Sequence, residues 1–207
     1  MRGFNRTAIG FWVVCIGLLL LGSVSAVAEG SATAAVKQVT ERMLSALEGR
    51  RSELERNPSK IYGLVDQILV PHFDFEKITR AAVGRHWRKA SSAQREALIR
   101  GFREMLIRTY AKALLNYSGE EIRYLSERPG PRSSAVVSAE VREPGAAPIP
   151  IDYKLYRKGK KWKIYDVRID AVSLVANYRG SFDSQIRRKG IDGLIKSLGE
   201  MNAKGKG

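Results

Sequence analysis

The fold class of this chain follows from one stretch, IPIDYKLYRKGKKWKIYDVRI, at residues 149–169. In its first half, apolar residues alternate with polar ones: Ile149, Ile151, Tyr153 and Leu155. Successive side chains of a strand point to opposite faces, so this alternation predicts a strand with one buried face. The basic segment at 157–160 contains Gly159 and predicts a turn into a second strand, from Trp162 to about Ile169.

The apolar pattern of this second strand changes phase along its length. Trp162 and Ile164 are expected to point to one face, whereas Tyr165, Val167 and Ile169 are expected to point to the other. Two explanations remain open at this point. Either both faces of the strand are covered, or a β-bulge shifts the phase.

The same period of two extends upstream through residues 121–142. Ile122 and Tyr124 begin a strand that ends at Pro129, and a further alternating set follows in the next strand: Val137, Ala139 and Val141. Sequential strands joined by short turns predict an antiparallel meander, here of about four strands over residues 121–169.

Residues 31–117, before the strands, have the apolar spacing of helices. Three shorter helical segments are expected to end near Gly49, at Pro71 and at Gly84. Proline and glycine are the residues that most often terminate a helix, so these positions mark the boundaries.

A longer helix is predicted from the capping box formed by Ser91 and Gln94 to about Asn116. On a helical wheel, its apolar side chains share one face: Leu98, Phe102, Met105, Leu106, Tyr110 and Ala113. Charged residues, among them Arg103 and Arg108, fill the opposite face, which is expected to be solvated.

Helical spacing returns after the strands, and closing helices are predicted over residues 171–202. A bulky stripe runs along the first of them: Leu174, Val175, Tyr178, Phe182 and Ile186. Helices packed on one side of an antiparallel sheet give an α+β class, with an overall cone shape.

The first 28 residues resemble a secretory signal. Arg2 and Arg6 precede an apolar run at 8–21, and an Ala-Val-Ala cleavage pattern follows at 26–28. An uncleaved anchor is the alternative, but the run is shorter than the roughly 20 residues that span a bilayer. We therefore expect cleavage and a single mature domain at residues 29–207 that is exported.

The chain is strongly basic, with a formal charge of +15 from 36 Lys and Arg against 21 Asp and Glu. Removal of Arg2 and Arg6 with the signal leaves +13, and removal of Cys15 leaves no cysteine. Thiol catalysis and cysteine-ligated zinc are thereby excluded for the mature chain. Export makes nucleic acid an improbable target for the basic residues, and an anionic membrane surface or an acidic protein is favoured.

No pattern in the sequence supports an enzyme. His72 and His86 are fourteen residues apart and lack the neighbouring ligands of a metal motif. Carboxylate pairs such as Asp166 with Asp170 have no base or nucleophile beside them. We expect no catalytic residues, no metal and no cofactor.

Three blocks of the chain resemble the MlaC family of periplasmic phospholipid-binding proteins, also called toluene-tolerance auxiliary proteins. They are WRKASSAQRE at 87–96, WKIYDV at 162–167 and RKGIDGL at 188–194. The resemblance extends in order along nearly the whole mature chain. Asp166 and Asp192 lie within these blocks, and we interpret them as structural, through capping or pairing.

The resemblance implies a nuclear-transport-factor-like α+β cone with an apolar cavity for lipid acyl tails. It also implies a carrier that moves phospholipid between the outer and inner membranes and supports outer-membrane lipid asymmetry. The implied partners are an outer-membrane lipoprotein complex and an inner-membrane ABC transporter complex with a substrate-binding ring protein. A related branch is associated with hopanoids, so another apolar lipid is an alternative ligand, and a binding or scaffold module with a filled core is an alternative function.

For the surface that contacts lipid tails, we predict twelve apolar or aromatic residues drawn from the three parts of the chain. They are Leu64, Ile68, Phe102, Leu106 and Tyr110 from the helical half, Ile151, Tyr153, Val167 and Ile169 from the sheet, and Val175, Tyr178 and Phe182 from the closing helix.

Overall fold

The sheet of this protein is an antiparallel meander, as predicted. The structure, a computed structural model, describes residues 30–204, so the predicted export signal lies outside the described residues. The strands pair in sequential order: β1 (Glu121–Gly130), β2 (Ser134–Arg142), β3 (Ile149–Lys158), β4 (Lys161–Ile169) and β5 (Val172–Ser173). The short β5 is a correction, because the closing helix was expected to begin at residue 171. Instead, residues 172–173 first pair with the end of β4.

A β-bulge in β4 explains the phase change seen in the sequence. Lys154 of β3 is paired with Asp166, and Leu155 is paired with Ile164, so Tyr165 is the extra residue on β4. The bulge lets Ile164 and Val167, on either side of it, both be buried in the core. Of the two explanations left open by the sequence, the bulge is therefore confirmed.

The helices follow the predicted boundaries to within a few residues, with three additions: a short helix after the first and two 3₁₀ turns. In chain order they are α1 (Ala32–Gly49), α2 (Arg51–Arg56), α3 (Lys60–Ile68), the 3₁₀ turn η1 (Val70–His72), α4 (Phe75–Val83), the 3₁₀ turn η2 (Gly84–Lys89), α5 (Ser92–Leu114) and α6 (Leu174–Lys204). Helix α6 is interrupted at Gly190, whose φ of 71° and ψ of 179° are not helical. This break divides α6 into two segments, in agreement with the more than one closing helix expected over residues 171–202.

Capping bonds fix where the main helices begin. The Ser91 hydroxyl accepts a bond from the Gln94 N–H while the Gln94 side chain accepts one from the Ser91 N–H, which completes the predicted capping box. The Gln94 amide also donates to Asp192 of α6, at 2.8 Å. Asp166 accepts bonds from Lys154 and from Ser173, beside the start of α6. Both aspartates in the blocks that resemble the MlaC family, Asp166 and Asp192, thus have a structural role.

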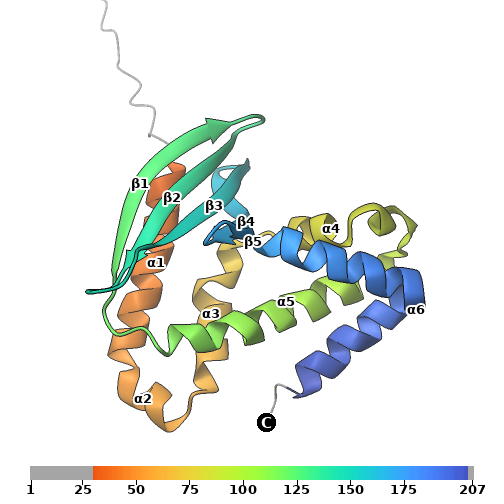
Figure 1. The fold of residues 1–207 in the computed structure, drawn as a ribbon, viewed down its shortest axis with the longest axis horizontal. Coiled ribbons are helices and arrows are strands. Elements are labelled where there is room, and N and C mark those ends of the chain that lie inside the picture. The colour runs from red at the N-terminus through yellow and green to blue at the C-terminus, as the bar shows by residue number, and fades with distance from the viewer. Residues whose placement is uncertain (1–29, 205–207) are drawn as a thin grey trace, which may run out of the picture.

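Helices and sheet are arranged as two packed bodies with α5 running between them (Figure 1). Helix α1 lies along the sheet and packs on β1 and β2, while α4 and α6 pack together around the first half of α5. The second half of α5 packs against α3. The predicted α+β class, with helices packed against an antiparallel sheet, is confirmed.

The polar face of α5 is less solvated than the sequence indicated. Arg103 forms an ion pair with Asp66 of α3, and the Arg108 guanidinium lies 5.3 Å from the ring centroid of Tyr62. On the same side of α5, Ala111 is buried against α3. The prediction of a fully wet face was wrong because α3 covers part of it, and long arginine side chains can pack their stems there while their charges are paired.

A buried carboxylate connects α4 to the sheet. Asp74 is 8% exposed and caps α4 by accepting a bond from the Lys77 N–H at 2.9 Å. It also accepts a bond from the Tyr156 hydroxyl and lies 3.3 Å from the Lys158 ammonium. Burial raises the pKa of Asp74, but the bonds from Tyr156 and Lys77 and the charge of Lys158 outweigh it, so the pKa is lowered.

We predict that Asp74→Asn destabilises the protein at neutral pH by about 2 kcal/mol, because hydrogen bonds to a charged acceptor are replaced by weaker ones. The ordinary pKa of this group is 3.8, and the folded value is lower. The stabilisation is therefore present above about pH 4 and is lost as pH falls through the folded pKa. Urea unfolding between pH 7 and pH 2 should show a smaller acid-induced loss in the variant.

The matched control for this prediction is Glu55→Gln, which removes an exposed carboxylate. That variant should unfold like the wild type at every pH. Equal acid sensitivity in Asp74→Asn and the wild type would contradict the role given to Asp74.

Candidate functional site

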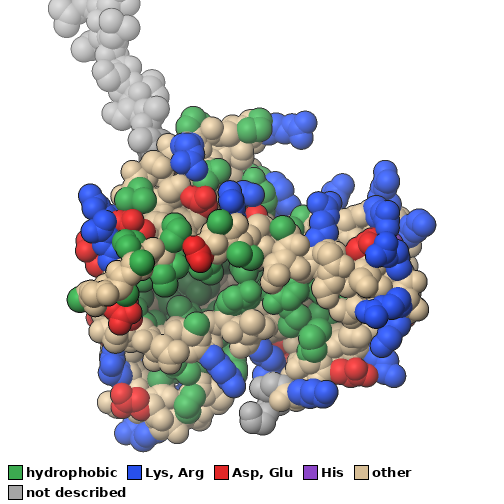
Figure 2. All heavy atoms as spheres, viewed as in Figure 1, with side chains coloured by type: hydrophobic (Ala, Val, Ile, Leu, Met, Phe, Trp, Pro, Cys, Tyr) green, Lys and Arg blue, Asp and Glu red, His purple; other side chains and the backbone are tan. Residues whose placement is uncertain are grey.

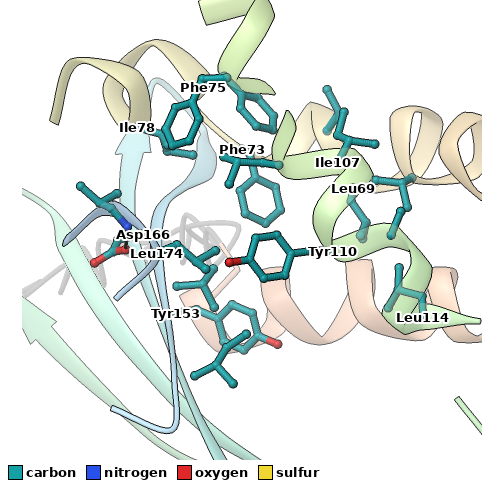
Figure 3. Close-up of a pocket in the computed structure, with 18 residues that line it drawn as sticks. Leu69, Phe73, Phe75, Ile78, Ile107, Tyr110, Leu114, Tyr153, Asp166 and Leu174 are labelled. Carbon is teal, nitrogen blue, oxygen red and sulfur yellow. Dashed lines mark hydrogen bonds between the residues drawn. The ribbon is translucent and has the colours of Figure 1, made fainter. Parts of the chain in front are cut away.

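Two apolar cavities lie between the sheet and the helices. The first has a volume of about 220 Å³ and is bounded by η1, α4, α5, β3, β4 and the start of α6. The close-up in Figure 3 shows its side chains converging from these elements, with Phe73, Tyr110 and Tyr153 between the sheet and α5. An apolar concave site of this kind can hold a hydrocarbon group and offers little for polar chemistry.

The second cavity is larger, about 470 Å³, and lies beside α1. Its apolar wall comes from α1, the end of α5 and strands β1 to β4: Val36, Val39, Met43, Ile122, Ile151 and Ile164. The connection between β2 and β3 contributes Ala146, Ala147 and Glu143, and Glu120 lies on the wall before β1. Figure 2 shows a hollow on this side of the molecule that is lined with hydrophobic side chains.

The two cavities share part of their walls. Five residues line both of them: Leu69, Phe73, Leu114, Tyr153 and Ile169. These come from the connection between α3 and α4, on either side of η1, from the end of α5 and from the sheet, so the shared wall lies where the helical and sheet parts of the domain meet. A ligand with two apolar arms would extend one arm on each side of this wall.

Charged groups are nearly absent from the cavity walls. Neither lining includes a Lys or an Arg, although the chain carries 36 of them. Asp166 borders the first cavity, but its carboxylate points away from the cavity centre in Figure 3 and is bonded to Lys154 and Ser173. The basic side chains gather elsewhere, notably over the part of the molecule that contains α4 and α6 (Figure 2).

Two tyrosines on these walls, Tyr110 and Tyr153, are neutral hydrogen-bonding groups at any physiological pH. Burial, followed by a hydrogen bond with Tyr178, raises the pKa of Tyr110 to about 12. Burial, with a smaller effect of Tyr124, raises the pKa of Tyr153 to about 12. Both hydroxyl groups are therefore uncharged where they face the cavities.

The structure brings eight of the twelve predicted tail-contacting residues to the cavities. Seven line the first one: Phe102, Leu106, Tyr110, Tyr153, Val167, Ile169 and Val175. Ile151 lines the second cavity, together with Tyr153 and Ile169. Their grouping reflects two periods that the sequence shows plainly, the inward face of the strands and the inward face of α5.

Four predicted residues lie in packed regions away from both cavity walls. Leu64 and Ile68 face the helical cluster that includes Met43, Leu47 and Leu54. Tyr178 and Phe182 pack edge-on against Phe102, with ring centroids 5.1 and 4.9 Å from it. Apolar periodicity identifies a buried face but does not distinguish a filled core from a cavity wall, which is why these four were included.

Several wall residues were missed at the sequence level. Phe73, Phe75 and Leu69 flank the turn between α3 and α4, and Leu114 lies at the end of α5. The aromatic pair around Asp74 was the available signal, because two large side chains beside a helix cap have to be buried somewhere. Val36, Val39 and Met43 of α1 have the spacing of one helix face, but nothing in this spacing relates that face to a cavity.

The remaining polar groups form local pairs. His86 lies 2.8 Å from Asp183, which also pairs with Arg85 and Arg187, on the surface between η2 and α6. Within residues 30–204 no three His, Cys, Asp or Glu side chains are placed to hold a metal ion. Over the same described residues, no helix has the length and apolar character needed to cross a membrane.

Proteins of known family resemble this chain over most of its length. The profile of the MlaC protein family matches residues 37–200. The intermembrane phospholipid transport system binding protein MlaC of Haemophilus influenzae is 28% identical over 179 residues, covering 84% of this chain and 83% of that protein. The toluene tolerance protein ttg2D of Pseudomonas putida is 26% identical over 158 residues, covering 76% of this chain and 74% of that protein.

A solved structure has the same fold. It is a phospholipid-binding protein from Ralstonia solanacearum, determined in complex with a phospholipid, with 33% identity and a TM-score of 0.79. The match covers 86% of this chain and 100% of that one. The family profile, the two sequence relatives and this structure agree, and the chain belongs to the MlaC protein family.

Proposed function

We propose that this protein binds a phospholipid by its acyl tails and carries it through the periplasm between the two membranes. The observation that supports this most strongly is the pair of apolar cavities with a shared wall, whose linings contain no Lys or Arg. The relatives named for phospholipid transport and the related structure with its bound phospholipid support the same ligand class.

The energetics of lipid transfer require such a carrier. Each buried methylene contributes about 0.8 kcal/mol, so two tails of roughly 15 methylenes would cost about 24 kcal/mol to expose to water. A cavity lined with alkyl and aromatic side chains offers the tails an environment close to that of the bilayer. Exchange with a membrane is then nearly balanced, and loading and unloading can both occur.

The finer parts of the proposal concern location and partners. We place the mature chain, beginning at Glu29, in the periplasm, where it would exchange lipid with an outer-membrane lipoprotein complex and with an inner-membrane ABC transporter complex through its substrate-binding ring. Its positive charge suits acidic docking surfaces or anionic headgroups on these partners. In this role it would support outer-membrane lipid asymmetry.

Lipid extraction tests the proposal directly. The mature protein, purified without detergent, should release phospholipid into organic solvent, and mass spectrometry should identify two-tailed species. A sample stripped of lipid should take phospholipid up again from vesicles. Recovery of no lipid, together with no uptake from vesicles, would refute the carrier function, and recovery of a different apolar lipid such as a hopanoid would refute the ligand class.

Leu114→Glu should reduce phospholipid uptake at least tenfold, because Leu114 lines both cavities and a carboxylate there would have to be buried beside the tails. Lys112→Glu is the matched control, since it introduces the same side chain at an exposed position of α5. Bound lipid is quantified by mass spectrometry, and circular dichroism checks that both variants fold. Equal uptake by the two folded variants would contradict the assignment of the cavities.

Export is tested on the full chain. When it is expressed in a Gram-negative host, the periplasmic fraction should contain protein whose first residue is Glu29. Ala28→Lys should block processing, because signal cleavage requires a small residue at this position, and should leave a precursor that is 28 residues longer. N-terminal sequencing and intact mass measure both outcomes, and an unprocessed wild-type chain would contradict the proposal.

A further inference from the structure

The Tyr153 hydroxyl is the one polar group on the shared wall of the two cavities. The other four residues that line both are Leu69, Phe73, Leu114 and Ile169, whose side chains are hydrocarbon. Tyr153 projects from the middle of β3, between Val137 of β2 and Val167 of β4 in the strand register. Figure 3 shows its ring near that of Tyr110, in the space between the sheet and α5.

This hydroxyl differs from the other tyrosine hydroxyls on the cavity walls in having no partner in the described part of the chain. Tyr110 is hydrogen-bonded with Tyr178. Tyr117 donates to the Glu120 carbonyl oxygen at 3.4 Å. Tyr153 has neither a hydrogen bond nor an ion pair, and only burial and the nearby Tyr124 affect its pKa. Because Tyr153 lines both cavities, its hydroxyl is free to donate to an acceptor on a molecule held there.

The surroundings of Tyr153 define what that acceptor is. No Lys or Arg lines either cavity, so a phosphate at this depth would be an unpaired buried charge. A neutral carbonyl oxygen, by contrast, needs only one neutral donor and tolerates apolar neighbours. In a two-tailed lipid with one tail in each cavity, the carbonyl groups lie next to the branch between the tails, which is where the shared wall is.

We propose that the Tyr153 hydroxyl donates a hydrogen bond to an acyl carbonyl oxygen of the bound lipid and so positions the branch between its two tails at the shared wall. This inference rests on the proposed carrier function and adds a specificity to it. The protein selects lipids with an acyl carbonyl at the branch between the tails over lipids with the same tails joined by ether bonds.

The test compares two phosphatidylcholines with identical tails and headgroup, one diacyl and one dialkyl-ether. Lipid-stripped protein is incubated with vesicles that contain the two lipids in equal amounts, and the bound lipids are quantified by mass spectrometry. The wild type should hold the diacyl lipid in about fivefold excess, the effect expected of one neutral hydrogen bond. Tyr153→Phe should lower this ratio to about one while still taking up the ether lipid.

Tyr165→Phe is the matched control, because it removes a tyrosine hydroxyl from a position of β4 that lines neither cavity. It should retain the wild-type ratio. Lipid-free Tyr153→Phe should also melt at or above the wild-type temperature, since it loses a hydroxyl without a partner.

Two results would overturn the inference while leaving the carrier function intact. One is a wild-type ratio near one, and the other is an unchanged ratio in Tyr153→Phe. Failure of the wild type to take up either lipid is distinguishable from both, because it would refute the carrier function itself.

Discussion

The packing of Phe102 against Tyr178 and Phe182 is the contact on which the rest of the domain depends. Ring centroids at 5.1 and 4.9 Å with interplanar angles near 70° give a tight edge-to-face cluster, and Phe102 and Phe182 are almost fully buried. This cluster fixes the first half of α5 to α6. Because the first half of α5 is held in this way, the second half can border the cavities without packing directly against the sheet.

An unfilled interior has an energetic cost, because side chains on a cavity wall lose contacts that a packed core would provide. The domain offsets this cost with filled clusters on either side of the cavities. One lies around Phe102 and Leu98, and the other packs α1, α3 and the end of α5 around Ile61. Asp74 and Asp166 add polar connections where α4 and α6 meet the sheet. The cavities therefore lie between two packed clusters.

Much of this arrangement is contained in local sequence patterns, and the part that is not depends on contacts between distant segments. The meander, the capping box at Ser91 and the breaks at Gly84 and Gly190 follow from alternation, capping chemistry and glycine geometry. The sequence left the bulge at Tyr165 as one of two explanations, because the bulge is selected by the pairing of β4 with β3, which is a contact between two segments. Leu64 and Phe182 show the limit for the site. Their spacing in the sequence indicates that they are buried. Only the packing of Leu64 with residues of α1, and of Phe182 with Phe102 of α5, shows that they do not border a cavity.

The separation of charge from the cavity walls has a consequence for how the carrier responds to salt. The basic side chains lie on the outside, whereas the linings contain no Lys or Arg. In the proposed function, ionic strength would act on the encounter with an acidic surface, through screening over roughly 10 Å, and would leave the holding of hydrocarbon almost untouched. The rate of docking and the lifetime of the loaded complex would then be governed by different forces, and each could change without the other.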